Sequence, residues 1–282
     1  MDFATTAAEI YVPDGLDETP ALARTTHLAI GAHQDDLEIM AIDGILQCFR
    51  REGKWFTGVI MTNGSGSPRA GLYGDTTNEE MMDIRVEEQR KAAMIGDYGA
   101  QIFLNYPSSA IKSGDVAAPV TDLVTILEAT RPDVVYTHNL ADKHLTHVGV
   151  AVKTIQAMRQ LPEDVRPAKL YGCEVWRGLD WMLDDEKVAF DCSDQTNLQN
   201  ALLGVFDSQV NGGKRYDLAA MGRRMANATY HASHDVDVTT GLAFAMDLTP
   251  LAVDPTLDIQ AYAQGYLDRL AQAVSDAISS VL

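Results

Sequence analysis

Short apolar runs alternate with amphipathic segments through the first half of the chain. Each run of strand length is followed by a segment whose apolar residues recur every three or four positions, as on one face of a helix. In residues 37–51, for example, Ile42, Ile45, Leu46 and Phe49 share such a face. The pattern predicts strands at 26–32, 55–62, 101–104 and 133–137 and helices at 37–51, 79–96, 120–130 and 146–160. This alternation predicts a parallel sheet that is joined by right-handed crossovers and covered by helices on both faces.

The pattern changes after residue 165. It predicts strands at 169–176, 187–191 and 241–248 and helices at 195–208, 216–230 and 254–281, the last of them long and amphipathic. Residues 1–25 show no regular pattern and are expected to form an irregular N-terminal arm. Because no internal repeat or low-complexity linker follows, residues 26–282 are expected to form a single α/β domain with a mostly parallel sheet and an elaborated C-terminal part.

The composition narrows the choice of partners. The chain has 40 acidic and 22 basic residues and a formal net charge of −18, so we do not expect it to bind nucleic acid. The negative charge does not exclude a small anionic substrate that one buried arginine holds. No apolar stretch is long enough to predict membrane insertion. Cys48, Cys173 and Cys192 are an odd number without CxxC spacing, which favours reduced thiols in a cytoplasmic protein.

A polar cluster directly follows the first strand of the predicted domain. The apolar run Leu28–Ala32 leads into His33, Asp35, Asp36 and Glu38, where the strand is expected to open into a helix. Ligands of parallel sheets bind at this position, outside the carboxyl ends of the strands. Taken alone, an Asp-Asp pair at a helix start is more often a cap that the helix dipole stabilises.

A second polar cluster, with His144 and His147, follows the strand predicted at 133–137. A lone HxxH pair often has no ligand role. Combined with His33 and Asp36, however, one of these imidazoles completes a set of two histidines and one carboxylate that leaves a coordination position open, as in catalytic zinc sites. A neighbouring carboxylate could then accept a proton from water, and the remaining histidine could stabilise an oxyanion or protonate a leaving amine. The two clusters together predict a metal-dependent hydrolase.

These residues carry a resemblance to a known family. The run Ala32–Glu38 resembles the AHPDD or AHxDDxE signature of the PIG-L/LmbE-like N-acetylglucosaminyl deacetylases. Supporting similarities extend from about residue 26 to about residue 210, at Thr62-Asn63-Gly64, Arg85–Glu88, Ala92-Ala93 and Ser208-Gln209. The resemblance implies a Rossmann-like fold and hydrolysis of an acetamide, usually on an amino sugar, with Zn²⁺ as cofactor or another divalent metal such as Fe²⁺.

The resemblance also implies a role for each residue of the two clusters. His33, Asp36 and His147 would be the metal ligands. Asp35 would be the general base, and His144 would be the electrostatic or general-acid histidine.

Three further residues are weighed through the same resemblance. Arg85 falls on a family arginine that contacts substrate, although an exposed helix arginine paired with Glu88 is an equally good interpretation. Glu38 is expected to cap or brace the helix after the first strand. Thr146 stands where the family motif HPDH commonly has an aspartate, which leaves the orientation and the pKa of His144 open.

We therefore expect a zinc-dependent N-deacetylase that removes an acetyl group from a small N-acetylated amino sugar or its conjugate. Relatives are often oligomeric, and the long terminal helix and residues 1–25 could cover neighbouring subunits, so a homo-oligomer is expected. One alternative is an amidase acting on a larger sugar-linked amide. Another, which Thr146 favours, is a carbohydrate-binding homologue with weakened catalysis.

Overall fold

The computed structural model describes residues 1–282 and centres on an eight-stranded sheet in the order β1-β4-β3-β2-β5-β6-β8-β7. The strands are β1 (Glu9–Tyr11), β2 (His27–Gly31), β3 (Phe56–Thr62), β4 (Ala100–Tyr106), β5 (Val134–His138), β6 (Lys169–Cys173), β7 (Val188–Asp191) and β8 (Leu242–Asp247). The strands from β4 to β6 run parallel, while β1 and β8 are antiparallel to their neighbours. The predicted α/β fold with a mostly parallel sheet is confirmed.

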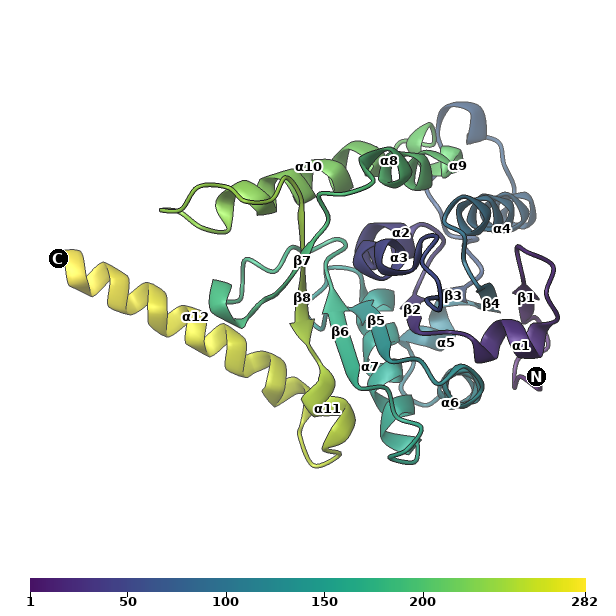
Figure 1. Cartoon of the computed structure of the whole chain (residues 1–282), viewed down its shortest axis with the longest axis horizontal. Helices are drawn as coiled ribbons and strands as arrows, with labels where there is room; N and C mark the ends of the chain where they lie inside the picture. The colour runs from purple at the N-terminus through teal and green to yellow at the C-terminus, as the bar shows by residue number, and fades with distance from the viewer.

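Helices cover both faces of this sheet (Figure 1). One face carries α2 (Asp36–Met40), α3 (Ile42–Cys48), α4 (Asn78–Ile95), α8 (Thr196–Gly204), α9 (Asp207–Val210) and α10 (Tyr216–Tyr230). The other carries α1 (Glu18–Ala23), α5 (Ser108–Lys112), α6 (Ala118–Thr130), α7 (Leu145–Gln160) and α11 (Thr249–Val253). None of the helices combines the length and the apolar character that crossing a bilayer requires.

The side-chain alternation along the strands divides the core into two layers. In β2, Leu28 and Ile30 point into the cluster beneath α6 and α7, whereas Ala29 points into the cluster beneath α2 and α3. Because successive side chains of a strand face opposite sides of the sheet, a strand covered on both faces must be apolar throughout. This explains why the apolar runs of the sequence predict the central strands well.

The predicted elements differ from the structure mainly where one long segment is divided into two. The helix predicted at 37–51 is interrupted at Ala41, whose backbone (φ −105°, ψ 27°) leaves the helical range between α2 and α3. The segment predicted at 195–208 is likewise divided into α8 and α9. The long terminal helix α12 (Ile259–Val281) begins later than predicted, because Pro255 disfavours helical backbone before it and Asp258 caps α12 by accepting the N–H of Ala261.

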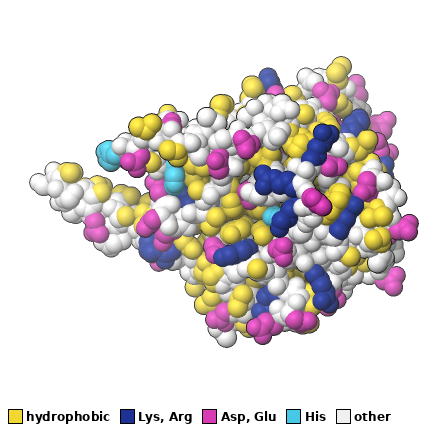
Figure 2. Space-filling model, viewed as in Figure 1, with side chains coloured by type: hydrophobic (Ala, Val, Ile, Leu, Met, Phe, Trp, Pro, Cys, Tyr) yellow, Lys and Arg dark blue, Asp and Glu magenta, His cyan; other side chains and the backbone are white.

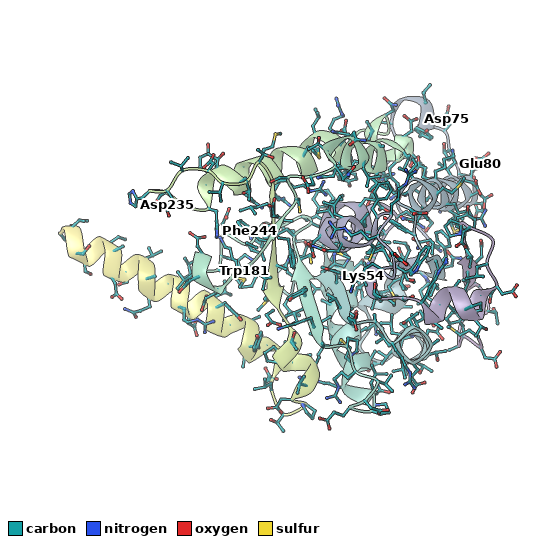
Figure 3. All side chains as sticks on the ribbon, in the orientation of Figure 1. Lys54, Asp75, Glu80, Trp181, Asp235 and Phe244 are labelled. Atoms are coloured by element: carbon teal, nitrogen blue, oxygen red, sulfur yellow. The ribbon has the colours of Figure 1, made fainter.

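The second half of α12 projects away from the rest of the protein (Figure 1). Its first turns are anchored, since the Tyr262 hydroxyl donates to the Asp247 carbonyl at 2.8 Å. Farther along, Val274 and Ile278 are 50% and 54% exposed. On the face shown in Figure 2, hydrophobic side chains gather in the region between α10 and α12, where Figure 3 places Trp181 and Phe244.

The N-terminal arm is more regular than expected, because it contains β1 and α1. The fully buried carboxylate of Asp122, on α6, holds this segment against the sheet. It accepts the N–H groups of Ala4 at 2.5 Å and Thr5 at 3.3 Å and the hydroxyl of Tyr106 at 2.5 Å. One buried anion therefore joins the arm, α6 and the end of β4.

We expect Asp122→Asn to lower the free energy of unfolding by about 2–4 kcal/mol, because hydrogen bonds to a buried anion become weaker or are lost. Urea unfolding followed by circular dichroism measures the change. Asp115→Asn, at an exposed position before the same helix, is the matched control and should stay within about 0.5 kcal/mol. Equal stabilities of the two variants would contradict this role of Asp122.

Candidate active site

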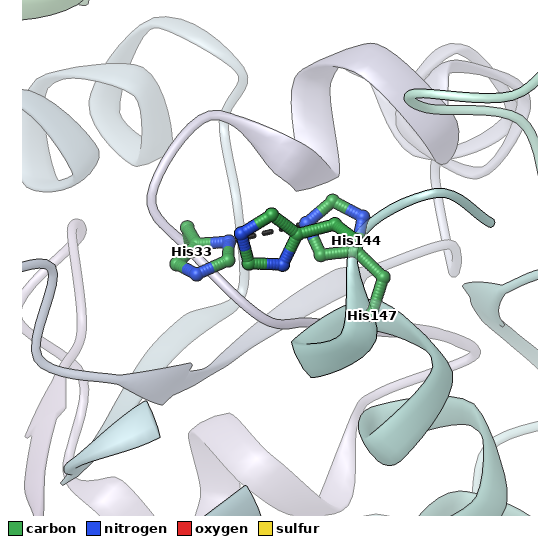
Figure 4. Close-up of side chains that lie close together, drawn as sticks. All are labelled: His33, His144 and His147. Atoms are coloured by element: carbon green, nitrogen blue, oxygen red, sulfur yellow. Dashed lines mark hydrogen bonds between the residues drawn. The ribbon is translucent and has the colours of Figure 1, made fainter. Parts of the chain in front are cut away.

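The two polar clusters of the sequence meet at the carboxyl ends of the neighbouring parallel strands β2 and β5. His33 and Asp36 follow β2 at the start of α2. His144 and His147 follow β5 at the start of α7. Figure 4 shows His33, His144 and His147 close together in space although more than a hundred residues separate the two clusters in the chain. The predicted juxtaposition of the two clusters is present.

Three ligand-type atoms of this cluster form a nearly equilateral triangle. His33 Nδ1 lies 3.2 Å from His147 Nε2 and 3.4 Å from an Asp36 carboxylate oxygen, and the same oxygen lies 3.5 Å from His147 Nε2. Zinc ligands bound at about 2.0–2.1 Å in a tetrahedron lie about 3.3–3.4 Å apart. The triangle thus has the dimensions of one face of a tetrahedral zinc site, and the ring of His144 lies within 4.8 Å of both histidines.

His138, at the end of β5, also lies close to this triangle. It forms a second group of ligand-type residues with Asp36 and His147. However, its Nε2 accepts the backbone N–H of Ala32 at 2.9 Å, so the lone pair of that nitrogen is already used. The ring stacks on His147 with centroids 3.9 Å apart. His138 therefore supports the imidazole of His147 from behind and is poorly placed to bind a metal.

Asp35 has an unusual backbone conformation. Its φ of 94° lies in the left-handed region, which residues other than glycine seldom adopt. Two side chains from α4 hold this backbone in place: Gln89 Oε1 accepts the Asp35 N–H at 3.2 Å, and the Arg85 guanidinium donates to the Gln34 carbonyl. Arg85 also lies 3.0 Å from the Asp35 carboxylate. The carboxylate next to the ligand triangle is therefore fixed by its backbone and by its side chain.

Burial shifts the proton affinities of the site residues in different directions. It raises the pKa of Asp35 to about 7, although Arg85 opposes the shift. Burial also disfavours ionisation of Asp36, but the facing imidazoles of His147 and His138 hold its pKa well below the usual range. Burial lowers the pKa of His147 to about 4. The imidazole of His147 is therefore neutral at neutral pH, as a metal ligand must be.

Arg85 is buried and does not form the exposed helix pair that was one interpretation of the sequence. It is 1% exposed and bridges the carboxylates of Asp35 and Glu88. Glu88 in turn accepts the backbone N–H and the hydroxyl of Ser208, at 2.6 and 2.7 Å. Arg85 also lines the pocket, so contact with a substrate stays a prediction, while its position beside Asp35 is observed.

Glu38 lies beneath the site. Its fully buried carboxylate accepts the amide of Gln89 at 2.8 Å and the hydroxyl of Tyr98 at 2.7 Å, and burial raises its pKa to about 7. Because Gln89 also holds the Asp35 N–H, Glu38 braces the site through α4 and does not cap α2.

Thr146 gives the ring of the neighbouring His144 no side-chain support, because its buried hydroxyl has no hydrogen-bond partner. A different carboxylate supports the other histidine of this cluster. Asp142 lies with one oxygen 3.5 Å from His147 Nδ1, and the same oxygen accepts the backbone N–H of His144 at 2.9 Å. Its other oxygen accepts the N–H of Trp176 at 3.0 Å. The ring of His144 reaches the pocket, and burial and the neighbouring His33 lower its pKa.

One cavity of about 440 Å³ opens above these residues. His33, Asp35, Asp36 and His144 form its floor. Gln209, from the Ser208-Gln209 similarity, lines its wall. Residues from outside the recognised motifs form much of the rest of the wall, and these include Trp176, Lys214, Tyr216, Ala220 and Arg223. The sequence analysis did not single out Lys214, Tyr216 or Arg223, because they lie in a stretch without a motif. The aromatic pair Trp176 and Tyr216, in edge-to-face contact at 5.9 Å, was the available signal.

The comparison with protein families agrees with the site. Residues 28–158 match the PIG-L family model, which is described as GlcNAc-PI de-N-acetylase. This span contains both histidine clusters and the α4 residues that hold Asp35. The predicted resemblance to the PIG-L family is confirmed over this part of the chain. No curated protein sequence matches the chain.

Several solved structures share the fold at low sequence identity. The N,N'-diacetylchitobiose deacetylase from Pyrococcus horikoshii is 18% identical, with a TM-score of 0.59 over 82% of this chain and 88% of that one. The 4-carboxy-2-hydroxymuconate hydratase GalB from Pseudomonas putida is 17% identical, with a TM-score of 0.59 over 79% and 95%. The conserved protein TT1542 from Thermus thermophilus is 19% identical, with a TM-score of 0.57 over 77% and 92%.

The loop after β3 provides a test of how tightly the site is packed. Gly64 has a φ of +71°, and a Cβ there would lie 2.5 Å from Gln34 Oε1 and 3.2 Å from Arg85 Cγ. We expect Gly64→Ala to lower the free energy of unfolding by about 1–3 kcal/mol, because it adds both a clash and backbone strain.

Gly66→Ala is the matched control in the same loop, since a Cβ at Gly66 meets nothing within 4 Å. Thermal unfolding of both variants measures the difference. A Gly64→Ala protein as stable as the control would show that the loop does not press on Gln34 and Arg85.

Proposed function

We propose that the protein is a metal-dependent deacetylase that hydrolyses the acetamide of an N-acetylated amino sugar or of its conjugate. One observation carries the proposal: two members of the His33–Asp36–His147 triangle, His33 and Asp36, line one substrate-sized cavity together with the clamped Asp35 carboxylate, and the buried His147 completes the triangle beneath them. The match of residues 28–158 to the PIG-L family model supports the same chemistry.

The residues divide the work as follows. His33, Asp36 and His147 would hold the metal, and Zn²⁺ there would supply a Lewis acid for activating water and polarising the acetamide carbonyl. Asp35 accepts the proton as the water oxygen bonds to the acyl carbon. His144, whose ring lies at the pocket floor, stabilises the developing oxyanion and then protonates the nitrogen as the C–N bond breaks. Acetate and a free amine leave.

The donor set fits zinc, because two neutral imidazoles and one carboxylate form a common catalytic zinc site. It also fits Fe²⁺, which accepts the same ligands. A teicoplanin deacetylase with a similar fold, 13% identical at a TM-score of 0.52, is described as having a zinc inhibited form. Activity must therefore be measured over a range of metal concentrations, so that activation by the bound metal is separated from inhibition by excess metal.

Three other activities have to be separated from deacetylation by experiment. The similarity to GalB, described as a hydratase, means that the fold alone does not select deacetylation. An amidase that acts on larger sugar-linked amides would use the same residues, so only a substrate panel separates the two. A catalytically weakened homologue is favoured by Thr146, which gives His144 no side-chain support, and the activity of the protein on the sugar panel tests it.

We also propose that the protein acts in the cytoplasm as a homo-oligomer. The three cysteines are free and buried, as is usual in a reducing compartment. The exposed apolar residues of α12 and the projection of this helix from the body support contact between subunits.

We expect Asp35→Asn to lower kcat for acetate release from N-acetylated sugars by about 10²- to 10⁴-fold, which is the usual contribution of a general base. The metal content should not change, because Asp35 is not a member of the triangle. Asp75→Asn, which replaces an exposed carboxylate (Figure 3), is the control and should keep full activity. Undiminished turnover by Asp35→Asn would exclude Asp35 as the base.

We expect Asp36→Asn and His147→Ala to weaken zinc binding by more than about 100-fold, because each removes a ligand. Asp142→Asn should weaken it by about 10- to 100-fold through the orientation of His147. Competition with a fluorescent chelator measures the affinities, and Lys143→Gln, at an exposed position in the same loop, is the control. Equal zinc affinity in all of these variants would contradict the proposed site.

A further inference from the structure

The wall of the cavity carries two cations without acidic partners. Lys214 and Arg223 both line the cavity, and neither forms an ion pair with a carboxylate. Arg85, by contrast, is matched on the floor by Asp35 and Glu88. What distinguishes Lys214 and Arg223 is their shared place, because both unpaired cations lie on the wall of the cavity that holds the candidate site. Two positive side chains on one cavity wall favour an anionic ligand there.

Each cation is positioned by the wall. The Lys214 ammonium lies 4.9 Å from the centre of the Trp176 ring, and its backbone N–H donates to the Gln209 carbonyl at 2.8 Å. Arg223, on α10, donates one guanidinium N–H to the Val175 carbonyl and keeps its other donors free of protein partners. Two charges held against the same short segment, Val175-Trp176, form a constrained donor set.

Glu174 is the acidic residue whose carboxyl group the charge of Arg223 affects. Its two oxygens, however, accept hydrogen bonds from other groups. One oxygen accepts the N–H of Leu179 at 2.9 Å, and the other accepts Asn227 at 2.9 Å and the N–H of Phe244 at 3.1 Å. Glu174 thus closes the junction between α10 and β8 and leaves the pocket-facing donors of Arg223 unused.

The aromatic residues of the wall complete a surface for a substituted sugar. Trp176 and Tyr216 meet edge to face, and both rings line the cavity. Faces of this kind pack on the apolar side of a sugar ring, while cations beside them bind a charged substituent. The whole arrangement lies in residues 174–223, beyond the span that matches the family model.

We infer that Lys214 and Arg223 form an anion-binding subsite, and that the substrate is an N-acetylated amino sugar bearing a carboxylate or a phosphate. This inference rests on the proposed function for the acetamide at the floor. It adds a second recognised group at the wall, so that acetamide and anion fix the sugar between them.

The test measures kcat/KM for acetate release from three sugars: methyl N-acetylglucosaminide, which is neutral, N-acetylglucosamine 1-phosphate and N-acetylmuramic acid. We expect wild type to prefer at least one anionic sugar. In Lys214→Gln and Arg223→Gln the preference for the anionic over the neutral sugar should fall about 10- to 100-fold, mainly through KM, because a charged hydrogen bond is lost. The two anionic sugars separate a phosphate site from a carboxylate site.

Two controls separate charge recognition from a structural role. Lys214→Arg keeps the charge and should retain most of the preference. Arg215→Gln removes the neighbouring exposed arginine, which pairs with Asp217 and does not line the cavity, and should retain all of it. A wild-type protein without anionic preference, or equal losses on neutral and anionic sugars in Lys214→Gln and Arg223→Gln, would overturn the subsite.

Calorimetry measures how the same three sugars bind to the Asp35→Asn protein, and this measurement distinguishes the inference from the proposed function. Anionic sugars that bind through Lys214 and Arg223 without acetate release from wild type would support the subsite and refute the deacetylase. Acetate release without a preference for anionic sugars would support the deacetylase and refute the subsite. Absence of both binding and turnover with all three sugars would refute the subsite as well.

Discussion

The site depends on the way α4 holds one strained peptide. Asp35 adopts a left-handed backbone, and the cost of that conformation is offset by Gln89 on its N–H and by Arg85 on the Gln34 carbonyl. This conformation turns the chain sharply between β2 and α2, so that His33 and Asp36 both face His147. The buried carboxylates of Glu38, on α2, and Glu88, on α4 itself, fix the two clamping side chains in turn. The geometry of the cluster is therefore a property of α4 as much as of the motif.

The amino-acid pattern predicted the parts of the fold that depend on periodicity. The central strands are apolar on both faces, which made them visible, and the two histidine clusters followed strands that proved to be neighbours. Breaks inside helices were not visible, because the interruption at Ala41 depends on tertiary packing and not on a breaker residue. The support of His147 by Asp142 was missed because the motif directed attention to Thr146, whereas the contact depends on how the loop after β5 folds back.

The cavity combines two regions with different origins. Its floor comes from the span that matches the PIG-L family, and its wall comes from Val175, Trp176 and α10. In the proposed function, the floor contains the groups that act on a bond common to many substrates. In the proposed subsite, Lys214 and Arg223 on the wall distinguish one substrate from another by charge. Relatives that share residues 28–158 can therefore differ in substrate without any change in their chemistry.

Asp142 joins these two regions, since one oxygen faces His147 and the other holds the backbone of Trp176. A displacement of the wall on one side of this carboxylate must alter the orientation of the imidazole on the other. Occupancy of the wall and affinity at the floor are then thermodynamically linked, and linkage is reciprocal: whatever factor a bound sugar applies to the metal, the metal applies to the sugar. Loss of Asp142 would then remove one shared coupling factor from both affinities at once.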